Sequence, residues 1–351
     1  MNVKRTTISD VAKEAGTSIA TVSRVLNNTN YPVRSELREK ILKTANMLNY
    51  TPNFFGKSLK SGKSNDIGVV VPSLINPFYS EVIAGIEKAC RKDGYNPIFC
   101  SSGNKPIKEK EFIDLLQQKY VEGILISTIN EDSDYIKQLI SCNTNIVFFD
   151  QQIPDFNGDS VTFDFYQAGM LSAQHLLEKG HQDIAFLSAP FERFSRRAIY
   201  KGFKEALLNA GTPFNETNLF ISSMEDDVSV VGSDEFENGR KLARIFLDAH
   251  CSATAIVTIN DITAFGIIQE LIKNGHRIPE DISVIGFDNI NLSAMINPPL
   301  TTVSQPSFEM GILAAKVLID RIERQNKIST QISLKPAIVE RESVKTLNHV
   351  D

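Results

Sequence analysis

Residues 10–27 read DVAKEAGTSIATVSRVLN, and this stretch decides the fold of the first part of the chain. Its apolar residues recur three and four positions apart on both sides of Gly16, which predicts two short helices over residues 8–15 and 19–27. Glycine often ends a helix because it adopts a left-handed backbone without steric cost, so we expect the chain to turn there. The pattern is typical of a helix-turn-helix, whose second helix enters a DNA major groove.

The ends of these helices carry residues that can cap them. Thr7 begins a capping-box pattern before the first helix, and Ser18 can cap the second. A third amphipathic helix is expected over residues 35–48. Arg34 stands at its capping position, so either Ser35 caps this helix one residue later or the helix has no side-chain cap, at a cost of about 1 kcal/mol.

Charge is divided unevenly along the chain. The 351 residues carry a formal net charge of −5, but residues 1–63 hold eleven basic and four acidic side chains, a net charge of +7. The remaining residues hold 26 basic and 38 acidic side chains, a net charge of −12. This division indicates a polyanion partner for the first segment only. The alternative is a plain three-helix bundle with a basic face, which the charge and the following linker-like segment disfavour.

From Asp66 onward, apolar runs alternate with amphipathic stretches. Near-continuous Val, Ile and Leu runs between helices are typical of parallel sheets covered on both faces. Ten runs are too many for one comfortable sheet, so we expect an α/β body of two doubly wound lobes. Ligands of such sheets bind beyond the carboxyl ends of the strands, which places the candidate site in the loops that follow. The runs span residues 67–71, 97–100, 123–127, 145–150, 160–164, 183–188, 218–222, 254–259, 282–288 and 300–305.

Several protein classes are excluded by motifs that the sequence lacks. GxGxxG, GxxxxGK[ST], HExxH and GxSxG do not occur, and the histidines are not spaced as metal ligands, so we expect no enzyme, cofactor or metal site. The four cysteines show no CxxC spacing and are expected to be buried thiols. No signal-peptide pattern and no apolar stretch of about 18 residues occurs, which predicts a cytoplasmic protein without a membrane partner.

Five motifs in one order resemble those of the LacI/GalR family of bacterial transcription regulators: VAKEAGTSIATVSRVLN, NYTPN, IGVVVPSLINPFY, IPEDISVIGFDN and PPLTTVSQP. The resemblance runs from Thr6 to Ser343. It implies a homodimeric repressor that binds a near-palindromic double-stranded operator and a small-molecule effector between the lobes of a periplasmic-binding-protein-like body. The implied domains are a helix-turn-helix over 1–50, a hinge helix or linker over 51–63, an N-subdomain of 64–163 and 292–325, and a C-subdomain of 164–291 and 326–345.

The resemblance also implies which residues contact DNA. Ile19 and Ala20 match the helix positions that discriminate between operators, and Arg24 matches an arginine that reaches a base edge. Hydroxyl and amide side chains nearby are better suited to phosphates, which position the protein without specifying sequence. The expected contacts of the first domain are Thr7, Ser18, Ile19, Ala20, Thr21, Ser23, Arg24 and Asn27.

Residues 52–62 resemble the family's hinge helix. Asn53 can cap it, but Gly56 weakens so short a helix, so we expect it to fold only when two copies meet in the minor groove. Leu59 matches a leucine that wedges between base pairs and kinks the operator. The alternative is a flexible tether with an incidental leucine.

The family's effector positions fall on polar and aromatic residues at strand ends, a composition that suits a polyol. They are Asn76, Phe78, Tyr79, Asp150, Phe163, Asn260, Asp288 and Gln305. Asp261 and Asp288 have an alternative role as helix caps. Two positions depart from the family pattern: Ile199 replaces its usual arginine anchor, whose role Arg197 could assume, and Asp234 replaces an aromatic residue, although Phe236 is close by.

We therefore expect a repressor of a carbohydrate-utilisation operon, with a sugar or sugar phosphate as the effector. One alternative keeps the DNA binding but replaces the sugar with a phosphorylated carrier protein that docks on the body, as in the family's catabolite-control members. A second is a solute-binding or enzymatic module fused to an inert first domain. No C-terminal leucine heptads occur, so a zipper-based tetramer is not expected.

Overall fold

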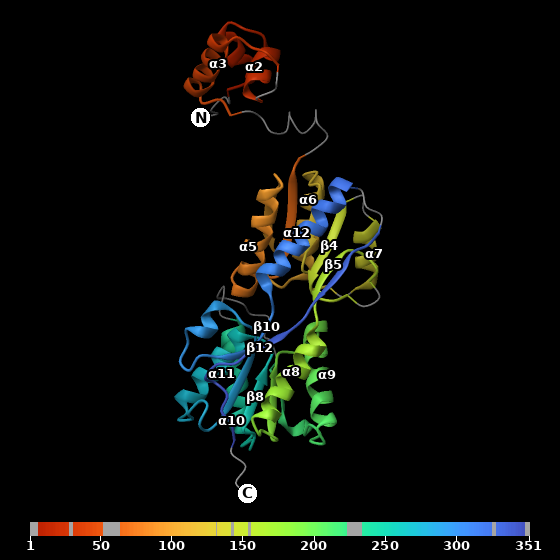
Figure 1. The fold of residues 1–351 in the computed structure, drawn as a ribbon, viewed down its shortest axis with the longest axis vertical. Helices are drawn as coiled ribbons and strands as arrows, with labels where there is room; N and C mark the ends of the chain where they lie inside the picture. The colour runs from red at the N-terminus through yellow and green to blue at the C-terminus, as the bar shows by residue number, and fades with distance from the viewer. Residues whose placement is uncertain are drawn as a thin grey trace. The chain divides into compact units, whose positions relative to one another are not determined.

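The fold is described by a computed structural model over residues 6–27, 31–51, 64–130, 132–141, 144–153, 156–222, 234–324 and 328–347. The chain forms two compact units, Met1–Ser64 and Asn65–Asp351, and each is described by itself. We call the first unit the head and the second the body (Figure 1).

The head is a bundle of three helices, α1 (Ile8–Ala15), α2 (Ile19–Leu26) and α3 (Ser35–Met47). They confirm the three predicted helices, with ends that agree to within one residue. Gly16 ends α1 with a φ of 67°, in the left-handed region that favours glycine. The small core between the helices consists of buried Val11, Ala12, Ala15, Val22, Val25, Ile41 and Ala45.

The predicted caps of α1 and α2 are confirmed. The backbone N–H of Thr7 donates to Asp10 Oδ2 at 2.8 Å, and the N–H of Asp10 donates to Thr7 Oγ1 at 3.4 Å, which together form the capping box. Ser18 Oγ accepts the N–H of Thr21 at 3.1 Å. Arg34 occupies the N-cap of α3 without a side-chain capping bond, so the uncapped alternative holds.

The body contains two six-stranded sheets, one in each of two lobes (Figure 1). The strand order is β11-β5-β4-β3-β1-β2 in the first sheet, where all neighbours are parallel, and β12-β10-β9-β8-β6-β7 in the second, where only β12 is antiparallel. All ten predicted strands are present. The first sheet comprises β1 (Asp66–Val71), β2 (Asn96–Ser101), β3 (Gly123–Ile126), β4 (Asn145–Asp150), β5 (Ser160–Phe163) and β11 (Gln331–Leu334). The second comprises β6 (Ile184–Ser188), β7 (Leu219–Ile221), β8 (Ala255–Thr258), β9 (Ser283–Asp288), β10 (Thr301–Ser304) and β12 (Ala337–Val339).

Helices cover the sheets, as expected for doubly wound lobes. In the first lobe α5 packs against α12, and in the second α8 packs against α9 and α10 against α11. The first lobe holds α5 (Pro77–Lys92), α6 (Pro106–Gln118), α7 (Ser133–Ser141) and α12 (Ser307–Arg324). The second holds α8 (Phe165–Glu178), α9 (Phe194–Asn209), α10 (Asp234–Asp248), α11 (Asp261–Lys273) and the short 3-10 helices η1 (Glu216–Asn218) and η2 (Asn291–Ala294). Among the described residues, no helix is both long and apolar enough to cross a membrane.

Two lobe boundaries differ from the prediction. Residues 292–325 were expected wholly in the first lobe, but β10 pairs with β9 in the second sheet, so the chain crosses after β10. Residues 326–345 were expected wholly in the second lobe, but β11 pairs with β5 in the first sheet. The run over residues 300–305 predicts β10 as a strand but does not indicate which sheet it joins. β11 is not among the ten predicted runs, and its partner β5 lies far earlier in the chain.

Asp261 is a buried junction within the second lobe rather than a helix cap. Its carboxylate accepts hydrogen bonds from Thr302 Oγ1 at 2.5 Å, Ser293 Oγ at 2.6 Å and the N–H of Ile290 at 3.0 Å. These partners lie on or beside β9, β10 and η2, so one side chain ties three segments to α11. Burial raises the pKa of Asp261 to about 7.

Replacing this junction should destabilise the body. We expect Asp261→Ala to lower the free energy of unfolding by about 3 kcal/mol, because three buried donors lose their acceptor. Asp164→Ala is the matched control, since Asp164 caps α8 through one partly exposed bond and its loss should cost about 1 kcal/mol. Urea unfolding followed by circular dichroism measures both, and equal costs would contradict the role of Asp261.

Candidate functional site

The outward face of α2 carries the side chains expected to read DNA. Ile19 is 49% exposed, and Ala20 and Arg24 are also exposed, while Val22 and Val25 of the same helix are buried. The Arg24 guanidinium lies 3.9 Å from the centre of the Tyr31 ring, a cation–π contact that steadies a long side chain. The helix therefore presents an apolar patch beside a positive group.

The polar residues around α2 are arranged at its two ends. Ser18 and Thr21 hydroxyls lie 2.8 Å apart at the start of the helix. At its end, Asn27 Nδ2 donates to the carbonyl of Ser23 at 2.8 Å. Thr7 caps α1 and is exposed. Hydroxyls, amides and free helix N–H groups suit phosphate oxygens, so these residues stay predicted backbone contacts.

The predicted hinge residues Asn53, Gly56 and Leu59 lie outside the described residues, and their roles stay predictions.

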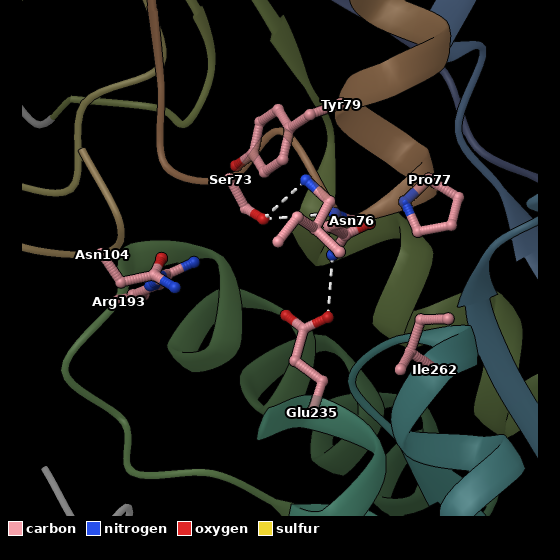
Figure 2. Close-up of a pocket in the computed structure, with 9 residues that line it drawn as sticks. Ser73, Asn76, Pro77, Tyr79, Asn104, Arg193, Glu235 and Ile262 are labelled. Atoms are coloured by element: carbon pink, nitrogen blue, oxygen red, sulfur yellow. Dashed lines mark hydrogen bonds between the residues drawn. The ribbon is translucent and has the colours of Figure 1, made fainter. Parts of the chain in front are cut away.

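The body has a pocket between its two lobes, which we call the interlobe pocket. It consists of two adjoining cavities with shared lining residues. We call the cavity of about 190 Å³ the mouth and the cavity of about 70 Å³, which contains the buried strand-end residues, the inner part. Loops that follow strands of both sheets line it, as the strand-end rule predicts. Figure 2 shows the mouth, lined by Ser73, Ile75, Asn76, Pro77, Tyr79, Asn104, Arg193, Glu235 and Ile262. The inner part adds Phe78, Asp150, Gln151, Phe165, Ser195, Arg196, Ile199, Ile259, Asn260, Asp288 and Gln305.

Asp150 is the centre of the polar groups that the first lobe contributes. It ends β4 and is buried, and its Oδ2 accepts hydrogen bonds from Tyr79 Oη at 2.9 Å, Gln151 Nε2 at 2.9 Å and Ser127 Oγ at 3.1 Å. Burial raises the pKa of Asp150, although these donors and Arg193 oppose the rise. Burial also raises the pKa of Tyr79, so this phenol stays protonated and can donate.

Asp288 is the corresponding group of the second lobe. It ends β9, is buried, and accepts a hydrogen bond from Gln305 Nε2 at 2.8 Å. Burial raises its pKa well above the usual range, and the carboxylates of Asp261, Glu235 and Asp150 raise it further. Its φ of 111° is rare for a residue with a side chain, and strain of this kind clusters at functional sites. Gln305 Oε1 is buried without a hydrogen-bond partner within the described structure.

Two predicted effector residues do not line the pocket. Arg197 is exposed and donates to the carbonyl of Phe191 at 2.9 Å, so it does not replace the missing anchor. Arg193, the N-cap residue of α9, lines both parts of the pocket, and Arg196, the residue before Arg197, lines the inner part. Consecutive residues of a helix point in different directions, so Arg196 faces the pocket while Arg197 does not. Phe163 is buried in the core, with its ring centre 5.2 Å from that of Phe165, and Phe165 lines the pocket in its place.

The structure places the two residues that depart from the family pattern, Ile199 and Asp234, on different helices. Ile199 is buried and lines the inner pocket, so an apolar group stands where the family resemblance implies an arginine. Arg196 supplies a cation close by, and burial lowers its pKa to about 10, which leaves it charged at neutral pH. Asp234 begins α10, and the next residue, Glu235, reaches the mouth. Phe236 is absent from the pocket lining that the described residues form.

The sequence prediction missed four polar residues of the mouth, Ser73, Asn104, Arg193 and Glu235, of which Ser73 follows β1. Asn104 and Arg193 follow β2 and β6, so the strand-end rule applied to every strand would have found them. Glu235 follows no strand closely and stands on a helix, and no signal in the sequence marked it. The structure does bring together seven predicted residues: Asn76, Phe78, Tyr79, Asp150, Asn260, Asp288 and Gln305. Of these, Asn260 also caps α11 by accepting the N–H of Thr263 at 2.7 Å.

Within the described residues, no group of three or more His, Cys, Asp or Glu side chains is arranged to hold a metal ion. The lining of the pocket consists of hydrogen-bonding, aromatic and apolar groups and carries both signs of charge, a composition that suits an organic ligand.

Comparisons with known proteins agree with this arrangement. Residues 7–53 match the model of bacterial regulatory proteins of the lacI family, and residues 64–340 match that of periplasmic binding proteins and the sugar-binding domain of the LacI family. The HTH-type transcriptional repressor PurR of Vibrio parahaemolyticus is 34% identical over 344 residues, which cover 97% of this chain and 99% of the relative. The chain belongs to the LacI family and is a DNA-binding transcriptional repressor rather than an enzyme.

Solved structures show the same fold. The Lac repressor dimer bound to operator and the anti-inducer ONPF is 26% identical, with a TM-score of 0.81 over 97% of this chain and 100% of that one. A LacI family regulator from Enterococcus faecium with bound ribose is 32% identical, with a TM-score of 0.70 over 81% of this chain and 100% of that one. The complex of the transcriptional regulator CelR with cellobiose is 26% identical, with a TM-score of 0.71 over 97% of this chain and all of that one.

Proposed function

We propose that this repressor controls a carbohydrate-utilisation operon and that its effector is a sugar bound in the interlobe pocket. The observation that supports this most is the polar lining of the pocket from both lobes, with Asp150 and Asp288 as buried acceptors and Asn260 and Gln305 as amides. Sugars present many hydroxyl donors, and rings such as Phe165 pack on their apolar faces. Two similar structures contain a bound sugar, cellobiose in one and ribose in the other. The similar repressors are named PurR, a name that does not refer to a sugar.

Titration calorimetry with the full-length protein tests the proposal. The panel contains D-ribose, cellobiose, hexoses, their phosphate esters and purine bases, which are flat and offer a different hydrogen-bond pattern. A micromolar to millimolar affinity for a sugar, coupled to a change in operator binding, is the expected result. Heat with a purine base but with none of the sugars would overturn the carbohydrate assignment and keep an effector-controlled repressor.

A phosphorylated carrier protein that docks on the body is the second candidate. The body resembles transcription regulator CcpA of Lactococcus lactis, which is 25% identical with a TM-score of 0.71 over 80% of this chain and 99% of that one. We favour a small molecule because the pocket keeps buried, hydrogen-bonded carboxylates and two arginines at its walls. The same titrations decide, since a carrier-controlled repressor would give no heat with any small molecule.

For the head, we propose that a homodimer places two copies of α2 in successive major grooves of a near-palindromic operator. Arg24 reads a guanine, Ile19 and Ala20 contact methyl groups, and the remaining predicted residues clamp phosphates. The exposure of Ile19 beside the steadied Arg24 supports this reading. An arginine bound to guanine O6 and N7 discriminates against other bases by about 1–3 kcal/mol.

Replacing Arg24 should therefore weaken and relax operator recognition. We expect Arg24→Ala to reduce operator affinity about 10- to 100-fold, while affinity for random DNA falls much less. Lys43→Ala is the control, because Lys43 carries the same charge but is paired with Glu39 at 2.8 Å on α3. Fluorescence anisotropy at fixed salt compares the two, and an equal loss on operator and random DNA would show that Arg24 only contacts phosphates.

A further inference from the structure

Two hydrogen bonds join the lobes directly across the mouth of the interlobe pocket. Asn76 Nδ2, on the first lobe, donates to Glu235 Oε2, on the second, at 2.8 Å (Figure 2). Arg193 Nη2, on the second lobe, donates to Asn104 Oδ1, on the first, at 2.5 Å. Asn76, Asn104, Arg193 and Glu235 all line the mouth. Because each bond connects two protein side chains, neither requires a bound molecule to form.

The orientation of Asn76 is fixed by the helix that it begins. Its Oδ1 accepts the N–H of Phe78 at 2.9 Å and so caps α5, while its own N–H donates to Ser73 Oγ at 3.1 Å. An amide is planar, so the capping oxygen on one side sends Nδ2 toward the opposite lobe, where Glu235 lies (Figure 2). A hydrogen bond to a carboxylate is about twice as strong as one between neutral groups. Asn76 thus couples a rigid helix end of the first lobe to α10 of the second.

We propose that the Asn76–Glu235 bond, backed by Asn104–Arg193, is a latch that holds the lobes together over the interlobe pocket. A ligand then enters only when the latch opens, and the cost of opening lowers the apparent affinity of the pocket. This inference rests on the proposed function in one respect only: the ligand that enters the pocket is taken to be the effector. The other residues that reach both parts of the pocket, such as Tyr79, lie within one lobe and make no such bridge.

Asn76→Asp separates the latch from the helix cap. Aspartate caps helices as well as asparagine does, so α5 keeps its first-turn acceptor. The donor that faced Glu235 becomes a carboxylate oxygen, however, and two carboxylates then repel across the mouth. Adding Glu235→Gln in the same chain supplies an amide that donates to the new carboxylate, which restores the bridge with donor and acceptor exchanged.

Hydrogen exchange of the full-length protein, without added ligand, measures how often the latch opens, because opening exposes backbone amides near the mouth. We expect Asn76→Asp to speed exchange about tenfold at the loop amides of residues 102–105 and 192–196, because opening of the lobes exposes them. Residues 77–82 should keep their protection, since the cap remains. The double variant Asn76→Asp with Glu235→Gln should return the loop amides to within about twofold of the parent protein. Residues 8–26 of the head are the internal standard.

Several results would overturn the latch. Unchanged exchange in Asn76→Asp, or a double variant that exchanges as fast as Asn76→Asp alone, would show that the bridge does not hold the lobes. Faster exchange confined to residues 77–82 would assign Asn76 to helix capping only. Since no effector enters the measurement, failure of every sugar to bind would contradict the proposed function and leave the latch intact.

Discussion

Deletion of residues 1–63 is expected to abolish operator binding and leave a folded, dimeric body. The removed segment carries a net charge of +7 and contains α2, whereas the remaining chain carries −12. An acidic body repels DNA, so no weak residual binding should replace the lost contacts. We expect operator affinity to fall at least about 1,000-fold, the usual span between specific and non-specific binding. Fluorescence anisotropy with labelled operator at fixed salt gives this ratio.

Three controls make the deletion informative. The body is a compact unit that begins at Asn65, so its thermal unfolding should match that of the body in the full-length protein. Size-exclusion chromatography should show a dimer, and titration with the sugar that the panel identifies should give the parent affinity. Operator binding by the truncated body would contradict the assignment of DNA contact to the head. A body that no longer folds would contradict the independence of the two units.

The parts of the fold that local pattern controls were predictable from the sequence. The three helices of the head follow from periodicity and from Gly16, and the ten predicted strands follow from their apolar runs. The lobe to which β10 and β11 belong was not predictable in the same way. Both are short strands next to crossings between the lobes. β10 pairs with the preceding strand β9, whereas the partner of β11, β5, lies far away in sequence. Pairing of that kind is decided by the whole packed body and leaves no local mark.

The residues of the pocket were also predictable only in part. Asp150, Asn260, Asp288 and Gln305 could be placed because the family resemblance assigns them to the effector site, and the strand-end rule puts the site in the loops where they lie. The prediction of Arg197 was wrong because residues 193–197 contain three arginines at the start of one helix, and their side chains point in different directions. Only the fold shows that Arg193 and Arg196 point into the pocket. Glu235 was not predictable, because its place in the pocket depends on where the start of α10 meets Asn76 of the other lobe, and no sequence pattern near residue 235 indicates this.

Asp288→Ala is expected to lower the affinity for the effector sugar at least about 100-fold. Asp288 is a buried acceptor of the second lobe, and Gln305 holds it in place at 2.8 Å. A buried ligand hydroxyl that loses this acceptor costs about 1–3 kcal/mol, and a 100-fold loss of affinity corresponds to roughly 2.7 kcal/mol. Arg197→Ala is the matched control, because Arg197 is exposed and directly follows the lining residue Arg196 in the chain, but lines neither part of the pocket. Calorimetry on both variants gives the ratio.

The stability of Asp288→Ala distinguishes a binding residue from a structural one. Burial and three neighbouring carboxylates raise the pKa of Asp288, and its backbone φ is 111°, so the folded protein bears a cost to keep this acid in place. Removing the carboxylate should leave the melting temperature unchanged or higher, as is common for residues kept for function. Weaker sugar binding with an unchanged melting temperature therefore supports the effector site. Parent-like affinity in Asp288→Ala would remove the carboxylate from that site, and a fall in both quantities would make Asp288 a structural residue.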